Sequence, residues 1–165
     1  MKEKNQGHVK AEMISVSAEQ TTELARRIGQ RLQKGDVLAL SGELGSGKTC
    51  FTGGLARGLG IDEKYRITSP TFTLINEYPA KFKLYHFDIY RIKDYTEFEE
   101  LGYEEYFSGE GVVVIEWAEK IAEILPEDSL ILKFEYLNDT ERKIIMRGPA
   151  GRLKELIKDT NMEVV

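Results

Sequence analysis

Residues 42–49 read Gly42-Glu43-Leu44-Gly45-Ser46-Gly47-Lys48-Thr49, which fits the pattern Gly-x4-Gly-Lys-Thr of a phosphate-binding loop. The apolar run Val-Leu-Ala-Leu at 37–40 precedes this loop, and residues 50–58, which are compatible with a helix, follow it. The loop therefore lies where a strand passes into a helix. That is the context in which a loop of this kind binds phosphate.

The residue types of the loop match the chemistry of a bound nucleotide. Its glycines allow backbone conformations that turn N–H groups inward on a phosphate chain, and the start of the following helix adds its positive end. Lys48 is expected to contact the terminal phosphates, and the hydroxyl of Thr49 to ligate magnesium. We predict that residues 42–49, with Cys50 directly after them, bind ATP or ADP together with Mg2+.

Length and composition indicate an ordinary globular protein. The chain has 165 residues, of which 41% are hydrophobic and 31% charged, so we expect one domain over 1–165, with residues 1–12 and 161–165 loosely held. No apolar run approaches the ~20 residues that span a bilayer. The first residues lack the apolar core of a signal peptide. We therefore expect a cytoplasmic protein without membrane association.

Charge and cysteine usage exclude other classes. The formal net charge is −5 and no dense Lys/Arg block occurs, whereas a protein that binds nucleic acid by itself normally carries a basic patch. Any contact with RNA is thus expected to be indirect. Cys50 is the only cysteine, which excludes an internal disulfide, and two histidines without a Cys/His cluster argue against a zinc site.

Hydrophobic patterns along the chain predict an α/β protein. Helices are expected at residues 18–34, 50–58, 118–125 and 152–158, with short helices broken at Gly102 within 94–107. Strands are expected at residues 36–41, 72–78, 82–88, 112–115, 129–136 and 141–147. Two of these pairs are too close in sequence for a parallel crossover and must form antiparallel hairpins. The prediction is a P-loop NTPase-like three-layer fold, with a mixed sheet of parallel core and antiparallel hairpins flanked by helices.

Two acidic residues each follow an apolar run. Asp88 and Glu116 are therefore expected at the carboxyl edge of the sheet, where open α/β sheets bind ligands. We predict that both acids organise magnesium and the attacking water. Trp117 follows Glu116 and lies either at the rim of this site or in the core. The loop Ser-Pro-Thr-Phe at 69–72 either senses the terminal phosphate or starts a strand.

Taken together, these motifs resemble a known family. Five segments occur in this order along the chain: Gly-Glu-Leu-Gly-Ser-Gly-Lys-Thr, Thr-Ser-Pro-Thr-Phe-Thr-Leu, His-Phe-Asp-Ile-Tyr-Arg, Glu-Leu-Gly and Ile-Glu-Trp. Their order and spacing resemble those of the TsaE (YjeE) family of small bacterial ATPases, and the resemblance covers about residues 14–150. The resemblance implies an accessory ATPase for the threonylcarbamoyl modification of adenosine 37 in tRNAs that read codons starting with A. It also implies TsaD and TsaB as partners, which carry the transferase active site.

The same resemblance implies roles for single residues. Lys48 and Thr49 bind phosphate and magnesium, Asp88 is the acid of the second motif, and Glu116 of Ile-Glu-Trp is an acid of the magnesium site. Arg142 matches a position where the family often has a basic residue close to the nucleotide.

Two other functions fit the same loop and acids. A small-molecule kinase would pass the γ-phosphate to a hydroxyl, but the candidate lid at 94–107 is acidic and lacks arginine. A nucleotide-dependent switch would hydrolyse little by itself, and the absence of a guanine-specific Asn-Lys-x-Asp motif argues against a GTPase. We expect slow turnover without partners. The aromatic residues within 95–107 either contact a partner or cover the sheet.

Overall fold

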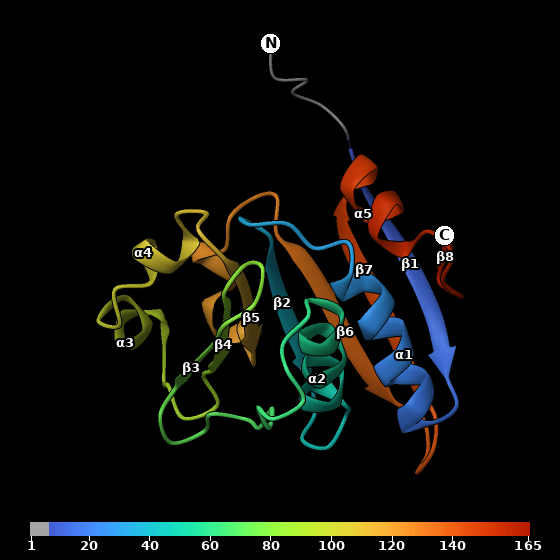
Figure 1. The fold of residues 1–165 in the computed structure, drawn as a ribbon, viewed down its shortest axis with the longest axis horizontal. Helices are drawn as coiled ribbons and strands as arrows, with labels where there is room; N and C mark the ends of the chain where they lie inside the picture. Colours follow the sequence, from blue (N-terminus) through green and yellow to red (C-terminus); the bar gives the residue numbers. More distant parts are fainter. Residues whose placement is uncertain (1–6) are drawn as a thin grey trace.

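The structure, a computed structural model, describes residues 7–165 and contains one eight-stranded sheet with helices on both faces (Figure 1). The strands are β1 (His8–Ser15), β2 (Val37–Gly42), β3 (Ile75–Tyr78), β4 (Leu84–Asp88), β5 (Val112–Glu116), β6 (Leu130–Tyr136), β7 (Arg142–Pro149) and β8 (Glu163–Val164). The helices are α1 (Ala18–Gly29), α2 (Lys48–Gly58), α3 (Tyr95–Glu99), α4 (Tyr103–Phe107), the 3-10 helix η1 (Ala118–Ile124) and α5 (Ala150–Ile157).

The sheet is mixed, as predicted. Its strand order is β3-β4-β5-β2-β6-β7-β1-β8. The four strands β4, β5, β2 and β6 run parallel to one another, and both predicted hairpins, β3–β4 and β6–β7, are antiparallel. The two central strands, β2 and β5, are almost wholly apolar because helices cover both of their faces. The predicted mixed sheet, with a parallel core and antiparallel hairpins, is confirmed.

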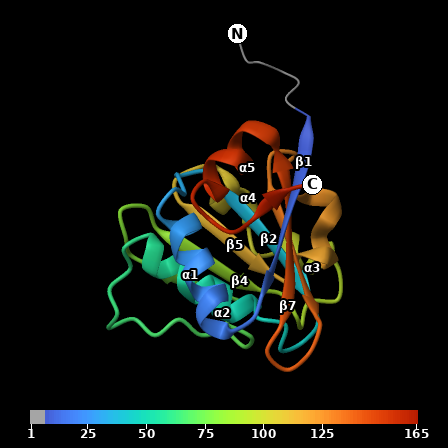
Figure 2. The same ribbon diagram turned by 90° about the vertical axis from the view of Figure 1, so that its right-hand side faces the viewer.

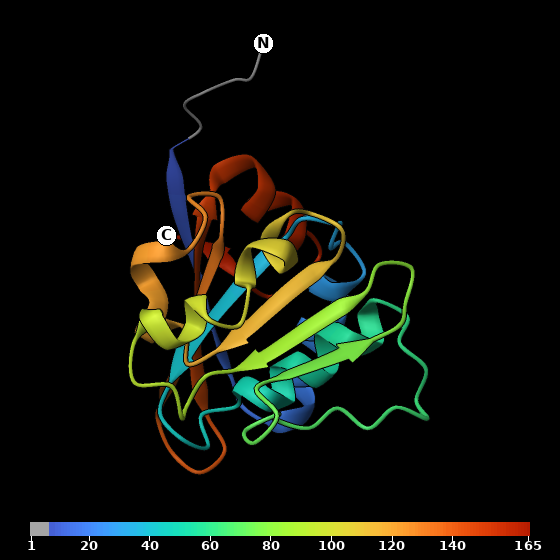
Figure 3. The ribbon, with the colours of Figure 1, turned by 90° about the vertical axis from the view of Figure 1, so that its left-hand side faces the viewer.

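The helices form two outer layers. Helices α1, α2 and α5 cover one face, where apolar side chains such as Leu24, Leu55 and Leu153 are buried against the sheet. On the other face, α3, α4 and η1 lie in front of the sheet in Figure 3 and contribute Phe98 and Ile121 to a second core. The edge view in Figure 2 shows α1 and α2 side by side on one side of the strands. This arrangement leaves the carboxyl ends of the parallel strands free to carry a site.

The ends of the chain differ from expectation. Residues 8–12, expected to be loosely held, belong to β1, which pairs with β7 along its whole length. Every second residue of this segment, Val9, Ala11 and Met13, faces the core, which is the alternation typical of a strand with one buried face. Within the expected loose tail, β8 pairs with β1 through Val164 and Ala11. Residues 1–6 lie outside the described part of the chain.

The aromatic segment around α3 and α4 packs inward. The ring of Phe98 is completely buried and stacks on Tyr103 at a centroid distance of 5.3 Å. The ring of Tyr106 packs edge-on against Phe87 of β4 at 5.2 Å. These rings cover the sheet, so they do not form the exposed contact surface considered from the sequence. Within residues 7–165, no helix is both long and apolar enough to cross a membrane.

Candidate active site

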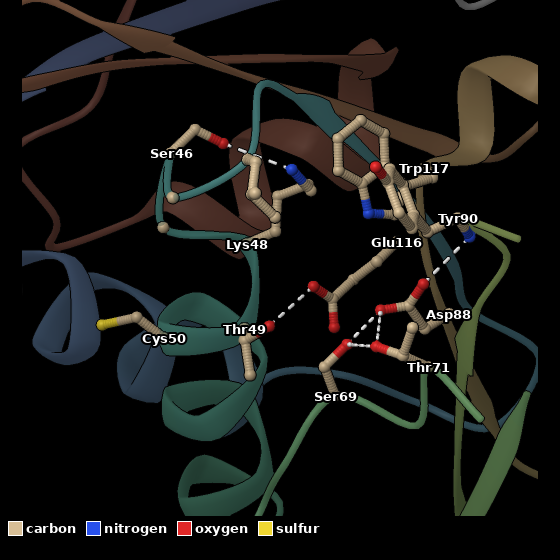
Figure 4. Close-up of a pocket in the computed structure, with 13 residues that line it drawn as sticks. Ser46, Lys48, Thr49, Cys50, Ser69, Thr71, Asp88, Tyr90, Glu116 and Trp117 are labelled. Atoms are coloured by element: carbon tan, nitrogen blue, oxygen red, sulfur yellow. Dashed lines mark hydrogen bonds between the residues drawn. The ribbon is translucent and has the colours of Figure 1, made fainter. Parts of the chain in front are cut away.

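The glycine-rich loop connects β2 to α2, as the sequence predicts (Figure 4). Gly42, Gly45 and Gly47 have φ angles of 148°, 76° and 106°, a region that residues with a side chain rarely adopt. A Cβ atom at Gly42 would also lie 2.6 Å from the carbonyl oxygen of Phe134. The loop therefore needs glycine for its backbone shape. Because α2 begins at Lys48, the free N–H groups of its first turn point to the space beside the loop.

Lys48 is folded back onto its own loop. Its Nζ donates hydrogen bonds to the carbonyl oxygens of Gly42 at 2.6 Å and Glu43 at 2.9 Å, and it lies 4.0 Å from the ring centroid of Trp117. Burial lowers the pKa of Lys48, whereas the nearby charge of Glu116 acts in the opposite direction. The site thus holds a desolvated cation whose present acceptors are neutral carbonyls and an aromatic face. A bound anion would be a stronger acceptor for the Lys48 ammonium than the neutral carbonyls or the aromatic ring.

The acid that ends β5 lies beside the end of the loop. Glu116 is 2% exposed, and its Oε1 accepts a hydrogen bond of 2.8 Å from the hydroxyl of Thr49. Its Oε2 is bonded to Nε2 of His86 on β4. The hydroxyl of Thr49, the last residue of the loop, is therefore joined directly to a buried carboxylate at the end of β5 (Figure 4).

The second acid lies next to the first. Asp88 is 3% exposed and directly opposite Glu116 in the parallel pairing of β4 with β5. Its Oδ2 accepts hydrogen bonds from the hydroxyls of Ser69 and Thr71, and its Oδ1 accepts one of 3.0 Å from the backbone N–H of Tyr90. The loop at 69–72 is thus tied to Asp88 through two hydroxyls, and its contact with the site is direct.

A cavity of about 430 Å³ brings these groups together. Its lining comprises Leu44, Gly45, Ser46, Gly47, Lys48, Thr49, Cys50, Ser69, Thr71, Asp88, Tyr90, Glu116 and Trp117. Trp117 lines this cavity and packs on Tyr90 at a centroid distance of 4.8 Å, and its half-buried ring also packs against the second core. A second cavity of about 450 Å³ shares Gly45, Gly47 and Cys50 with the first and extends away from the acids.

Four predicted residues occupy distinct places around the loop. Arg142 lines the second cavity, and its Nη2 donates to the carbonyl oxygen of Gly45 at 3.2 Å, which puts its guanidinium next to the loop. Leu44 is 81% exposed at the tip of the loop, and the side chain of Glu43 is also exposed. Cys50 is half-buried, and its thiol lies 3.2 Å from the hydroxyl of Thr22.

Sequence reasoning missed two residues of the site. His86 contacts Glu116, and Tyr90 packs on Trp117 at the cavity. His86 had a detectable signal, because it is a polar residue inside an apolar strand, two positions before Asp88 and so on the same face. Tyr90 had none, because it follows the end of its strand.

A glycine-rich loop between a parallel strand and a helix, with a carboxylate at the end of the adjacent strand, defines the P-loop NTPase-like class of nucleotide-binding proteins. The comparisons give the family within that class. A family model described as "Threonylcarbamoyl adenosine biosynthesis protein TsaE" matches residues 15–144. The chain belongs to the TsaE family.

Similar proteins agree with this assignment. The tRNA threonylcarbamoyladenosine biosynthesis protein TsaE of Treponema pallidum is 44% identical over 131 residues, which cover 79% of this chain and 96% of that protein. Its counterpart in Bacillus subtilis is 42% identical over 146 residues, with coverage of 88% and 90%. The crystal structure of YdiB from Bacillus subtilis superposes with a TM-score of 0.75 at 36% identity and covers 94% of this chain and 96% of that one.

Proposed function

We propose that this protein is a magnesium-dependent ATP hydrolase that acts as an accessory, energy-coupling subunit in the formation of threonylcarbamoyladenosine at position 37 of tRNAs reading ANN codons. Its membership of the TsaE family supports the role in this modification. The hydrogen bond of 2.8 Å between Thr49 and the buried carboxylate of Glu116 carries the proposal of hydrolysis. It joins the phosphate-binding loop to an acid at the edge where α/β sheets bind ligands.

The phosphates would lie on the glycine-rich loop. Backbone N–H groups of the loop and of the first turn of α2 would hold them, with the positive end of the helix behind. Lys48 would exchange the carbonyl oxygens of Gly42 and Glu43 for phosphate oxygens, which are stronger acceptors because they are charged. This exchange supports binding of both ATP and ADP.

Magnesium fits the oxygen atoms at the end of the loop. Among residues 7–165, no group of three or more His, Cys, Asp and Glu side chains could hold a metal ion by itself. Mg2+ is commonly held by one or two carboxylates together with substrate phosphates and water, which does not require such a group. Thr49, Glu116 and Asp88 supply hard oxygen atoms at the cavity. When bound there, magnesium would offset the phosphate charge.

The nucleoside would occupy the second cavity. From the loop, a bound phosphate chain could extend in two directions. One leads to Asp88 and Glu116 in the first cavity, and the other leads past Gly45 into the second cavity, which Arg142 lines. The first leads to the carboxylates that would hold magnesium, so the terminal phosphate belongs there. The base and ribose then extend into the second cavity. Trp117 would cover the phosphate end, consistent with its contact to Lys48.

The kinase alternative has less support. Helices α3 and α4, the candidate lid, pack against the sheet and contribute no residue to the lining of the cavity. That lining also contains no arginine. Hydrolysis by an accessory subunit needs another molecule to make it useful, and homologues of TsaD and TsaB are the proposed partners. Contact with tRNA would then be indirect, and the protein would work in the cytoplasm with its substrate.

Product analysis tests this proposal. Purified protein would be incubated with ATP and Mg2+, with and without TsaB and TsaD homologues and candidate hydroxyl acceptors, and ADP, phosphate and phosphorylated acceptor would be measured. We expect ADP and inorganic phosphate in equal amounts, formed slowly alone and faster with the partners. A phosphorylated acceptor would favour the kinase, and tight binding without phosphate release in any mixture would favour the switch.

A further inference from the structure

His86 occupies a place in the sheet where an aliphatic side chain would be expected. It lies on β4, is completely buried, and is paired in register with Val114 of β5. On the same face of the neighbouring strands lie Val112 and Leu40, which are also completely buried. Parallel strands covered on both faces normally carry apolar residues throughout. An imidazole at this position needs an explanation other than packing.

The contacts of the ring are one-sided. Nε2 is bonded to Oε2 of Glu116, whereas Nδ1 is buried and has no hydrogen-bond partner among the described residues. A buried polar atom without a partner destabilises a folded protein, and phenylalanine or leucine at this position would avoid that penalty. Departures of this kind from a consistent core are expected where a residue serves function.

We propose that His86 is a positioning residue for Glu116. Because the carboxylate is the acceptor, the ring donates through Nε2–H and fixes Oε2, which leaves Oε1 directed at the hydroxyl of Thr49. The carboxylate plane is then held from both sides, by β4 and by α2. Without His86, Glu116 could rotate and present both oxygens, or neither, to the end of the loop.

The consequence for chemistry rests on the proposed function. Mg2+ demands near-ideal octahedral geometry, and a carboxylate held with one oxygen forward offers one ligand position rather than two. Residues that orient a ligating group in this way affect activity although they do not touch the substrate. His86 would therefore govern turnover more than nucleotide binding, since the loop backbone holds the phosphates.

Three substitutions separate positioning from packing. The amide nitrogen of glutamine reaches about as far as Nε2 of histidine, and that of asparagine only about as far as Nδ1. We expect His86→Asn and His86→Phe to lower kcat by about 10- to 100-fold with little change in KM for ATP. His86→Gln should retain most of the wild-type kcat. Leu84→Val, a change in the same face of β4 that leaves Glu116 untouched, is the control and should keep the wild-type kcat.

Two measurements on the nucleotide-free protein do not depend on activity. The chain has two histidines, so nitrogen-15 NMR of the ring, assigned with His86→Phe, reports whether Nε2 carries the proton, and Glu116→Gln should shift that signal. Urea unfolding of His86→Phe, Glu116→Gln and the double variant gives the coupling between the two side chains. If His86→Phe does not fold, the same cycle uses His86→Asn.

The outcomes divide clearly. A proton on Nε2, a non-zero coupling, and rescue of kcat by glutamine but not by asparagine support the inference. Equal kcat for the glutamine and asparagine variants, a coupling of zero, or an unprotonated Nε2 would overturn it. Failure of the proposed function would look different, because the wild-type protein itself would then release no phosphate while the NMR and unfolding results stood.

Discussion

Replacing Lys48 by alanine removes the one cation that the loop holds inside the cavity. In the nucleotide-free protein Nζ is 2.6 Å and 2.9 Å from two backbone carbonyl oxygens, and the residue is only 4% exposed. A bound phosphate would replace these neutral acceptors with charged ones. The variant loses that charged contact in the nucleotide-bound state, and in the free state it lacks the carbonyl hydrogen bonds that the wild-type lysine gives up on binding.

The magnitude follows from this exchange. A hydrogen bond to a charged group contributes about 1.5–3 kcal/mol, and one to a neutral group about 0.5–1.5 kcal/mol. Because the wild-type lysine gives up carbonyl bonds to reach phosphate, we expect the net loss near the lower part of the range of about 1.5–3 kcal/mol. The whole range corresponds to about a 10- to 100-fold weaker Kd for ADP.

Isothermal titration calorimetry with ADP and Mg2+ measures the effect directly. Lys34→Ala, which removes an exposed lysine remote from the cavity, is the matched control and should bind as the wild type does. Circular dichroism would establish that both variants are folded. An unchanged Kd for a folded Lys48→Ala protein would refute the placement of phosphate on this loop.

Four further outcomes are expected. Asp88→Asn and Glu116→Gln should each lower kcat far more than they weaken nucleotide binding, since the backbone holds the phosphates, and a wild-type rate at saturating ATP would show that the acid was misassigned. The fluorescence of Trp117, the only tryptophan, should change on adding ADP because the Lys48 ammonium moves away from the indole ring. Unchanged fluorescence at saturating ADP would contradict that movement. Arg142→Ala should weaken binding of ADP but not of inorganic pyrophosphate if the nucleoside lies in the second cavity, and equal losses for both would place it elsewhere. Hydrogen bonds from Arg26 and Arg27 lower the pKa of Glu23 from 4.5 to about 2. The ionised carboxylate therefore stabilises the folded protein fully above pH 4.5, and this stabilisation is lost as the pH falls through about 2. In acid unfolding, Glu23→Gln should lack this pH-dependent loss of stability.

The parts of the fold that could be predicted from the sequence have local signals. The glycines at 42, 45 and 47 adopt the positive φ angles that their spacing implies, and both hairpins connect segments a few residues apart. The carboxylates at the ends of β4 and β5 could be found because an acid directly after an apolar run marks the edge of a parallel sheet.

The missed features depend on partners distant in sequence. Strand β1 alternates apolar and polar residues, but its neighbour β7 follows it by more than a hundred residues, so no local pattern indicated the pairing. The contact between His86 and Glu116 joins two neighbouring strands, and it could be recognised only once β4 and β5 were known to be adjacent. The sequence left open whether the rings of Phe98 and Tyr103 contact a partner or cover the sheet, because sequence alone does not show which face a short helix buries.

Multiple-turnover formation of threonylcarbamoyladenosine tests the central proposal most directly. Purified TsaB and TsaD homologues, unmodified tRNA and threonylcarbamoyl donor would be combined with wild-type protein, with Glu116→Gln, or with neither, and modified nucleoside and released phosphate would be counted together. We predict repeated turnover and phosphate release with the wild type, and little beyond one round with Glu116→Gln. Equal modification in all three mixtures, with no rise in phosphate release on assembly, would contradict the proposed coupling of ATP hydrolysis to tRNA modification.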